Sequence, residues 1–145
     1  MKRFKAIIFD LGGVLSKGKR SRGVHDAVAK KLGISLDQYF DSIDEIYSVA
    51  ITGTISSGKA LQMMAKNLNT TPKRLAKIYM QAYEKNFKRD EVLYKVAINL
   101  KKKGYKISII SDIWKVAKDA ILTKKDYGKF NDIIASCDVG VRKTN

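Results

Sequence analysis

The stretch "AIIFDLGGVL", residues 6–15, decides the fold class of this chain. An apolar run, residues 6–9, follows charged residues and leads into Asp10 and a pair of glycines. A short continuous apolar run with these boundaries is typical of a strand that is buried on both faces. We therefore expect Asp10 to lie at the carboxyl end of a buried strand. A single carboxylate at that position calls for a structural or functional explanation.

Two later runs repeat this apolar pattern, at residues 107–110 and 133–135. A helical spacing of hydrophobic residues precedes the first of these runs, over residues 93–100, and another fills the interval between the two runs. Three lysines and then Gly104 follow the earlier helical pattern, which is the expected end of a helix. Strands that alternate with helices in this way predict an α/β fold with a parallel sheet.

The middle of the chain, from about residue 23 to residue 87, shows helical patterns and no convincing strand. Ser35 and Gln38 have the spacing of a capping box, which marks the start of one helix. Thr71 precedes Pro72, the only proline, as a helix cap precedes proline at the first helical position. These signals predict an all-helical segment inserted after the first strand.

The predicted domain organisation follows from this contrast. We expect residues 1–15 and 88–145 to form the α/β core and residues 16–87 to form the inserted helical segment. The stretch "SKGKRSRG", residues 16–23, is predicted to be a flexible linker into the insert, because it is rich in glycine, serine and charge.

Length and composition restrict the class of protein. A chain of 145 residues with 45% hydrophobic content can form one compact domain with a small insertion. No window approaches the roughly 20 apolar residues of a membrane-spanning helix, and charge occurs too early for a secretory signal. Cys137 is the only cysteine, which excludes an internal disulfide and a zinc cluster made of thiols. We therefore expect a cytoplasmic protein with no membrane partner.

The formal net charge of +15 raises the question of nucleic-acid binding, since clustered lysine and arginine neutralise phosphates. The lysines are scattered, as in "LKKKGYK", and no nucleic-acid-binding motif accompanies them. We therefore do not favour a dedicated nucleic-acid function. A solvated basic surface still attracts anionic substrates by long-range steering.

Polar residues follow the first two predicted strands. Asp10 ends the first run, and Ser111 with Asp112 ends the second. In open parallel sheets, ligands bind beyond the carboxyl ends of the strands, so neighbouring strands would bring these groups into one crevice. The alternative is that Asp10 and Asp112 only cap turns or helix starts, as short polar side chains do routinely.

The motifs now resemble a known family. "FDLGGVL" (residues 9–15), "IISDIW" (109–114) and "SCDVGVRK" (136–143) resemble, in order, the first three motifs of the haloacid dehalogenase (HAD) superfamily. "TGTIS" (52–56) resembles a turn often found in the helical type 1 cap of that family. The resemblance implies an α/β fold: a HAD-like Rossmannoid parallel sheet with an inserted helical cap, truncated at the C-terminus.

The resemblance also implies an activity and a set of site residues. It implies a HAD-type phosphatase, a Mg²⁺-dependent hydrolase that acts on a small phosphomonoester and forms an aspartyl-phosphate on Asp10. Ser111 would bind a phosphoryl oxygen, Asp112 would lie beside the substrate, and Lys143 would pair with the nucleophile. Asp10 and the backbone carbonyl of Gly12 would bind the Mg²⁺ cofactor.

Two departures from the family pattern bear on activity. Gly12 stands where the family's phosphatases carry a second aspartate, the general acid and base, whose loss typically costs about 10² to 10⁴ in rate. Asp112 is a conceivable substitute. The sequence stops after "VRKTN", residues 141–145, before a fourth motif with metal-binding aspartates. We therefore expect a fragment, or a homo-oligomer or partner chain that completes the sheet, because an exposed strand edge favours pairing.

Three alternatives to the phosphatase remain open. The first is a catalytically impaired HAD remnant with a binding or assembly role. The second is a dehalogenase, a branch that also lacks the second aspartate and uses no metal, although its first motif contains an aromatic residue where this chain reads "DLGG". The third is a basic nucleic-acid binder, which would show steep salt dependence.

Aromatic residues and the only histidine are assigned to structural roles. Tyr39, Phe40 and Tyr47 have helical spacing and are predicted to form the core of the helical insert. Trp114 is predicted to pack rather than to line the crevice. His25 has no second histidine as a metal partner, so a surface position is expected.

Overall fold

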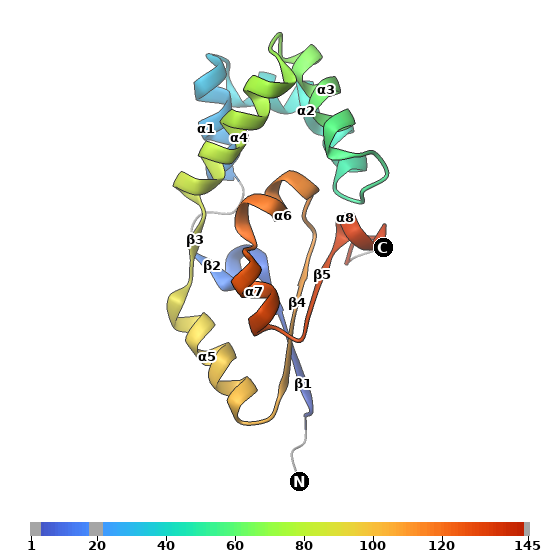
Figure 1. Cartoon of the computed structure of the whole chain (residues 1–145). Helices are drawn as coiled ribbons and strands as arrows, with labels where there is room; N and C mark the ends of the chain where they lie inside the picture. The colour runs from blue at the N-terminus through green and yellow to red at the C-terminus, as the bar shows by residue number, and fades with distance from the viewer. Residues whose placement is uncertain (1–3, 18–21, 144–145) are drawn as a thin grey trace.

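The computed structural model describes residues 4–17 and 22–143 (Figure 1). The strands are β1 (Ala6–Asp10), β2 (Ser16–Lys17), β3 (Lys88–Arg89), β4 (Lys106–Ser111) and β5 (Asp132–Ala135). The helices are α1 (Arg22–Leu32), α2 (Leu36–Ala50), α3 (Ser57–Asn67), α4 (Pro72–Asn86), α5 (Glu91–Lys102), α6 (Lys115–Ile121), α7 (Lys124–Lys129) and α8 (Ser136–Val139), and a tight π-type turn, η1, covers Leu11–Leu15.

The sheet that carries the site is parallel and has the strand order β1-β4-β5. Asp10 is in register with Ile110, and Ser111 is in register with Ala135. All three predicted strands are confirmed, as is the expectation that the first two are neighbours. The carboxyl ends of β1 and β4 therefore lie side by side at one edge of the sheet.

The two faces of this sheet differ in burial. Phe9, Ile107 and Ile109 lie on one face and are buried. Ile8 and Ile134 lie on the other face, where their side chains are 62% and 40% exposed. A second copy or another chain that completes the sheet stays a prediction.

Local sequence signals set the helix boundaries as expected. The Ser35 hydroxyl accepts the Gln38 N–H, and the Gln38 side chain accepts the Ser35 N–H, which is the predicted capping box. Thr71 caps α4, whose first residue is Pro72. Gly33 follows the end of α1 with φ +75°, a left-handed conformation that glycine adopts without strain.

The helical insert is joined to the rest of the chain by a short antiparallel ribbon. Ser16 pairs with Arg89 and Lys17 with Lys88, so the segments that enter and leave the insert run side by side (Figure 1). The predicted linker of residues 16–23 is therefore partly regular, because its first two residues form β2 and its last two begin α1. Residues 18–21 of that linker lie outside the described part of the chain.

Helices α1 to α4 pack on one another, and α4 also contacts α6 of the sheet-bearing part. Figure 1 shows these four helices beyond the carboxyl ends of β1 and β4, with α6 between them and the sheet. The division into a core and an insert at residues 16–87 stays a prediction. Among the described residues, no helix is both long and apolar enough to cross a membrane.

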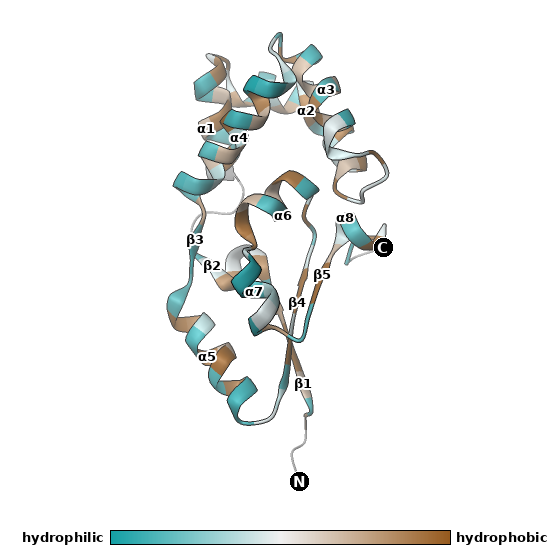
Figure 2. Ribbon diagram, viewed as in Figure 1, coloured by the Kyte–Doolittle hydropathy of each residue, from teal (hydrophilic) through white to brown (hydrophobic). Residues whose placement is uncertain are grey.

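Buried aromatic side chains connect the helices to the sheet-bearing part. Tyr39, Tyr79 and Trp114 are fully buried, and the Trp114 Nε1–H donates to the Tyr83 hydroxyl over 3.0 Å. The Tyr39 and Tyr79 hydroxyls are 2.5 Å apart. The predicted packing roles of Trp114 and Tyr39 are confirmed, and Figure 2 shows the hydrophobic segments of β4 and β5 that continue this core.

His25 corrects a sequence-based expectation. It is 5% exposed, and its Nδ1 lies 2.8 Å from the Tyr39 hydroxyl, with the Phe40 and Tyr47 rings beside it. Burial lowers the pKa of His25 to about 4, against a weaker opposing effect of Asp44. The predicted surface position was wrong, because the spacing that places aromatic residues on one face of α2 also provides a partner for a buried imidazole.

A buried ion pair connects the ribbon to α7. Arg89 of β3 donates to both carboxylate oxygens of Asp126, over 2.8 and 2.9 Å, and the Asp126 side chain is completely buried. The Thr123 N–H and hydroxyl donate to the same carboxylate. The Asp126 carboxylate therefore has a cation and two further hydrogen-bond donors as partners, which offset the cost of burying its charge.

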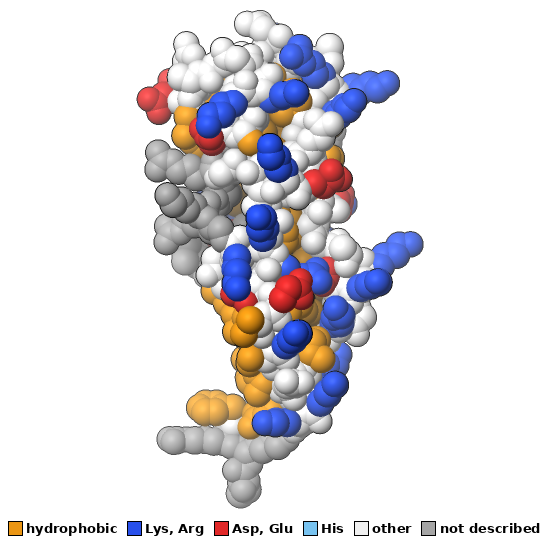
Figure 3. Space-filling model, turned by 90° about the vertical axis from the view of Figure 1, so that its left-hand side faces the viewer, with side chains coloured by type: hydrophobic (Ala, Val, Ile, Leu, Met, Phe, Trp, Pro, Cys, Tyr) orange, Lys and Arg blue, Asp and Glu red, His pale blue; other side chains and the backbone are white. Residues whose placement is uncertain are grey.

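Positive charge is spread over the surface. Figure 3 shows lysine and arginine side chains from the top to the bottom of one face, with acidic side chains among them. The expectation that nucleic acid is not a dedicated partner stays a prediction.

Candidate active site

Asp10 ends β1 with its side chain about one third exposed, and Lys143 lies against it. The Lys143 Nζ is 2.8 Å from Asp10 Oδ2, with side-chain exposures of 28% and 37%. These two residues are separated by most of the sequence and meet because the segment after α8 returns to the carboxyl end of β1. The predicted pairing of a carboxylate with a lysine is therefore present in the structure.

Asp112 positions the lysine segment. Its Oδ1 accepts the backbone N–H of Lys143 over 2.9 Å, and its Oδ2 lies 3.6 Å from Arg142 Nε. Both carboxylate oxygens thus face the 142–143 segment. Asp112 therefore holds Lys143 near Asp10, which makes it a poor candidate for a free proton donor.

Ser111 shares the sheet edge with Asp10 but not its face. Side chains alternate along a strand, so Asp10 lies on the face of Ile110 and Ser111 on the opposite face. Ser111 is 7% exposed and borders a cavity. In the described part of the chain no hydrogen bond joins Asp10 to Ser111, and Asp10 does not line the cavity that Ser111 borders. A ligand bound by both would have to reach them from beyond the strand ends.

The turn after Asp10 wraps over the end of the strand. Gly13 has φ +77° and donates its N–H to the Ser16 hydroxyl over 3.1 Å. Gly12 has φ −74° and ψ 113°, which any residue can adopt, and a Cβ at this position would meet no atom within 4 Å. The missing side chain at Gly12 is therefore a chemical difference from a phosphatase motif and not a steric requirement of this fold.

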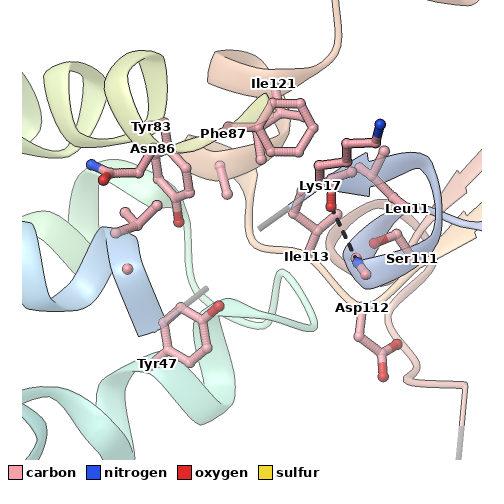
Figure 4. A pocket seen from close by; sticks show the side chains of 16 residues that line it. Leu11, Lys17, Tyr47, Tyr83, Asn86, Phe87, Ser111, Asp112, Ile113 and Ile121 are labelled. Carbon is pink, nitrogen blue, oxygen red and sulfur yellow. Dashed lines mark hydrogen bonds between the residues drawn. The ribbon is translucent and has the colours of Figure 1, made fainter. Parts of the chain in front are cut away.

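A cavity of about 420 Å³ lies between the insert helices and the carboxyl edge of the sheet. Figure 4 shows the phenol rings of Tyr47 and Tyr83 entering from two sides, with their hydroxyls turned toward the space between them. The lining residues are Leu11, Gly12, Gly13, Ser16, Lys17, Gly23, Val24, Tyr47, Tyr83, Asn86, Phe87, Ser111, Asp112, Ile113, Ala117 and Ile121.

Both tyrosines of the cavity are neutral at ordinary pH. Burial raises the pKa of Tyr47 to about 12, and Arg142 opposes that rise. Burial also raises the pKa of Tyr83, and the hydrogen bond from Trp114 opposes it. The Tyr83 hydroxyl accepts the indole N–H, so its own O–H remains available as a donor into the cavity.

Most of this lining was not predicted from the sequence. Tyr47 was assigned to the core of the insert, Ile121 was assigned only to a helical pattern, and Tyr83, Asn86 and Phe87 were not predicted to line a site. Helical spacing marks such residues as inward-facing, but it does not tell whether they face another side chain or a cavity.

The turn between α2 and α3 contacts the start of α8. The Ser136 hydroxyl donates to the Ile51 carbonyl over 2.6 Å and accepts the Ile113 N–H over 2.9 Å. Gly53 follows with φ +68°, and a Cβ there would lie 2.2 Å from the Cys137 carbonyl oxygen. This turn contains the "TGTIS" stretch, and it touches the core where α8 leads toward Lys143.

The donors at the end of β1 suit a hard divalent cation. The Asp10 carboxylate and the Gly12 carbonyl are oxygen ligands, and Mg²⁺ commonly binds through one or two carboxylates together with substrate phosphate and water. Within residues 4–17 and 22–143, no group of three or more His, Cys, Asp or Glu side chains could hold a metal ion. The donor set therefore fits Mg²⁺ that binds together with a phosphate, and not a preformed metal cage.

The chain is similar to known proteins at the level of family and fold. A family model described as haloacid dehalogenase-like hydrolase matches residues 4–145. Comparison with curated protein sequences gives no significant match.

Solved structures match over nearly the whole chain. The HAD family enzyme BT-2542 from Bacteroides thetaiotaomicron has a TM-score of 0.76 at 14% identity, over 99% of this chain and 74% of that one. A predicted HAD-like family hydrolase from Porphyromonas gingivalis has a TM-score of 0.74 at 18% identity, over 98% and 71%. The HAD-hydrolase YfnB from Bacillus subtilis has a TM-score of 0.60 at 15% identity, over 98% and 69%. At these identities the likeness establishes the α/β fold.

Proposed function

Because the chain belongs to the haloacid dehalogenase-like hydrolases, we propose that it is a phosphatase that hydrolyses a small phosphomonoester, with Asp10 as the nucleophile. One observation carries this proposal. A carboxylate and an ammonium group lie 2.8 Å apart at the carboxyl edge of a parallel sheet, where such sheets bind ligands. Residues adjacent to Asp10 in sequence line a cavity of a size suited to a small molecule.

In the proposed reaction an Asp10 oxygen forms a bond to phosphorus, and the ester oxygen leaves with the bonding electron pair. Water then attacks the aspartyl-phosphate, which regenerates the carboxylate and releases inorganic phosphate. Lys143 orients the attacking carboxylate and offers a positive charge to the phosphoryl oxygens.

The neighbouring side chains have supporting roles in this proposal. Ser111 would donate its hydroxyl to a phosphoryl oxygen that projects beyond the strand ends. Asp112 would act through Lys143, because it holds the backbone of that residue. Asp112 is not proposed to bind substrate directly, because its two carboxylate oxygens face Lys143 and Arg142.

Mg²⁺ is the proposed cofactor, with the Asp10 carboxylate and the Gly12 carbonyl as its protein ligands. When bound, it neutralises the charge that develops on the phosphoryl group. The BT-2542 enzyme has been crystallised with magnesium and inorganic phosphate, which supports the same pairing here.

The second candidate is a HAD-type protein that binds a phosphorylated ligand without turnover. Gly12 favours it, because the position that would carry a general acid has no side chain. The described residues also lack an acidic cluster that could hold a metal ion without phosphate.

The test uses acetyl phosphate, a small phosphoryl donor that makes no demand on the cavity. The full chain is incubated with acetyl phosphate and MgCl₂, and its intact mass is measured after an acid quench. We expect one added phosphoryl group, absent in Asp10→Asn and strongly reduced in Lys143→Met. Failure of wild type to acquire the group or to release phosphate would reject the phosphatase in favour of binding alone. Halide release from a 2-haloacid without Mg²⁺ would instead identify a dehalogenase.

A further inference from the structure

We propose that the substrate is the phosphate ester of a phenol-like alcohol, with its aromatic ring in the cavity between Tyr47 and Tyr83. This inference rests on the proposed phosphatase function and names its substrate class. Two separate features of the structure lead to it, the lining of the cavity and the missing side chain at position 12.

Part of the cavity wall is hydrocarbon, where a sugar would need hydrogen bonds. Its walls include Val24, Phe87, Ile113 and Ile121, and Figure 4 shows Phe87 and Ile121 together at one end. A sugar placed against these four side chains would leave the hydroxyls that face them without partners, and each such group typically costs about 1–3 kcal/mol. An aromatic ring instead gains from burial against these side chains.

The charged groups of the lining are already engaged. Lys17 Nζ lies 3.8 Å from the Asp90 carboxylate, and Asp112 faces the Arg142 and Lys143 segment. Figure 4 shows both Lys17 and Asp112 turned away from the space between the two phenol hydroxyls. The interior of the cavity is therefore suited to an uncharged group.

The aromatic character of the lining also favours a ring. Tyr47 and Tyr83 present their rings as walls, and aromatic pairs add about 0.5–1.5 kcal/mol beyond simple burial. Their two hydroxyls can serve one polar substituent, since the Tyr83 O–H is free to donate. The cavity thus suits a compact ring with few polar atoms.

Position 12 leads to the same class by a different argument. Without a carboxylic acid beside the ester oxygen, the leaving group departs as an anion. A phenol has a pKa near 10, as in tyrosine, whereas an aliphatic alcohol is a much weaker acid. A phenolate can therefore leave with the electron pair of the P–O bond and take a proton from water afterwards, while an alkoxide needs the donor that Gly12 does not provide.

The second step lacks the same group. Water adds to phosphorus, the Asp10 oxygen leaves as carboxylate, and the protons of the water pass to phosphate and solvent without a positioned base. We therefore expect phenol to appear in a burst of about one equivalent per chain, followed by slower turnover, as for other covalent intermediates whose breakdown limits the rate.

The first experiment compares phenyl phosphate with glycerol 1-phosphate as substrates of the full chain with Mg²⁺. Phenyl phosphate should be preferred at least about 100-fold in kcat/KM, and phenol release should show the burst. Acetyl phosphate labelling of Asp10 without a preference for phenyl phosphate would overturn this inference and leave the proposed function intact.

The second experiment separates binding from leaving-group chemistry. Phenylphosphonate and methylphosphonate cannot be hydrolysed by this route, and calorimetry gives the affinity for each. We expect phenylphosphonate to bind at least about tenfold more tightly, from burial of the ring. Equal affinities would overturn the inference, whereas tight binding in a chain that acetyl phosphate cannot label would support the ring site and reject the phosphatase.

A variant and a matched control locate the ring. Ile121→Asn places an amide in the cavity wall and should remove most of the preference for phenylphosphonate. Val92→Asn changes a residue that is 67% exposed on α5, outside the lining, and should leave the preference unchanged. Unfolding in urea checks that both variants are folded, and an unchanged preference in folded Ile121→Asn would place the ring elsewhere.

Discussion

Replacing Gly53 by alanine should break the contact between the α2–α3 turn and α8 and so destabilise the protein. Gly53 has φ +68°, and the new Cβ would lie 2.2 Å from the Cys137 carbonyl oxygen, a backbone atom that cannot swing away. The turn between α2 and α3 would have to move off α8. That movement breaks the buried hydrogen bond of 2.6 Å between the Ser136 hydroxyl and the Ile51 carbonyl.

Gly33→Ala is the matched control for this substitution. Gly33 has φ +75°, close to that of Gly53, but a Cβ there would meet no atom within 4 Å. The left-handed conformation alone costs roughly 1–2 kcal/mol in either variant. The broken hydrogen bond adds about 1–3 kcal/mol in Gly53→Ala, because the Ile51 carbonyl loses the buried hydroxyl that donates to it.

Urea unfolding of both variants measures the difference. Gly53→Ala should lower the free energy of unfolding by about 1–3 kcal/mol more than Gly33→Ala. In a Ser136→Ala background the excess should shrink, because the hydrogen bond is already absent and coupled sites are not additive. Equal losses in the two glycine variants would mean that the turn does not touch α8, and the contact between the α2–α3 turn and α8 would have to be abandoned.

Three further predictions concern His25, Arg89 and Gly12. In the folded protein His25 is protonated only near pH 4, whereas the unfolded chain binds that proton near pH 6.5, so the free energy of unfolding should decline as pH falls between these values, by roughly 3 kcal/mol in all. Urea unfolding at a series of pH values should show a flatter pH dependence in His25→Asn. An unchanged pH dependence in that variant would place His25 in solvent. Arg89→Met leaves the fully buried Asp126 without its cation and should cost about 3–5 kcal/mol, whereas Lys30→Met, which breaks an exposed pair, should cost less than about 1 kcal/mol in the same assay. Gly12→Asp should raise the rate of phosphate release from glycerol 1-phosphate by a factor of about 10² to 10⁴. Gly12→Asn cannot transfer the proton and should leave that rate unchanged. Equal rates in the two variants would show that protonation of the leaving group does not limit the reaction.

Local signals in the sequence were sufficient to predict the three strands of the parallel sheet and the starts of two helices. The apolar runs at residues 6–9, 107–110 and 133–135 became β1, β4 and β5, and their parallel order followed from the helices between them. The capping box at Ser35 and the proline after Thr71 fixed the starts of two helices. Such signals work because capping and hydrophobic periodicity act within a few residues.

The pair of Asp10 and Lys143 was predicted only through the family resemblance. A chain with 29 lysines and arginines gives no local sign of which cation will meet a given carboxylate. The meeting depends on the path of the segment after α8, and on Asp112, which holds the backbone of that segment.

What the sequence determined by itself is therefore the set of strands and helices, their order, and the position of a carboxylate at a strand end. Only the tertiary structure decided that His25 is buried, that Arg89 meets Asp126, and that Tyr47 and Tyr83 border a cavity. The physical reason is the distance along the chain over which the interactions act. A periodic pattern shows which side of a helix turns inward, but what it meets there is set by residues tens of positions away, through contacts that no local pattern contains.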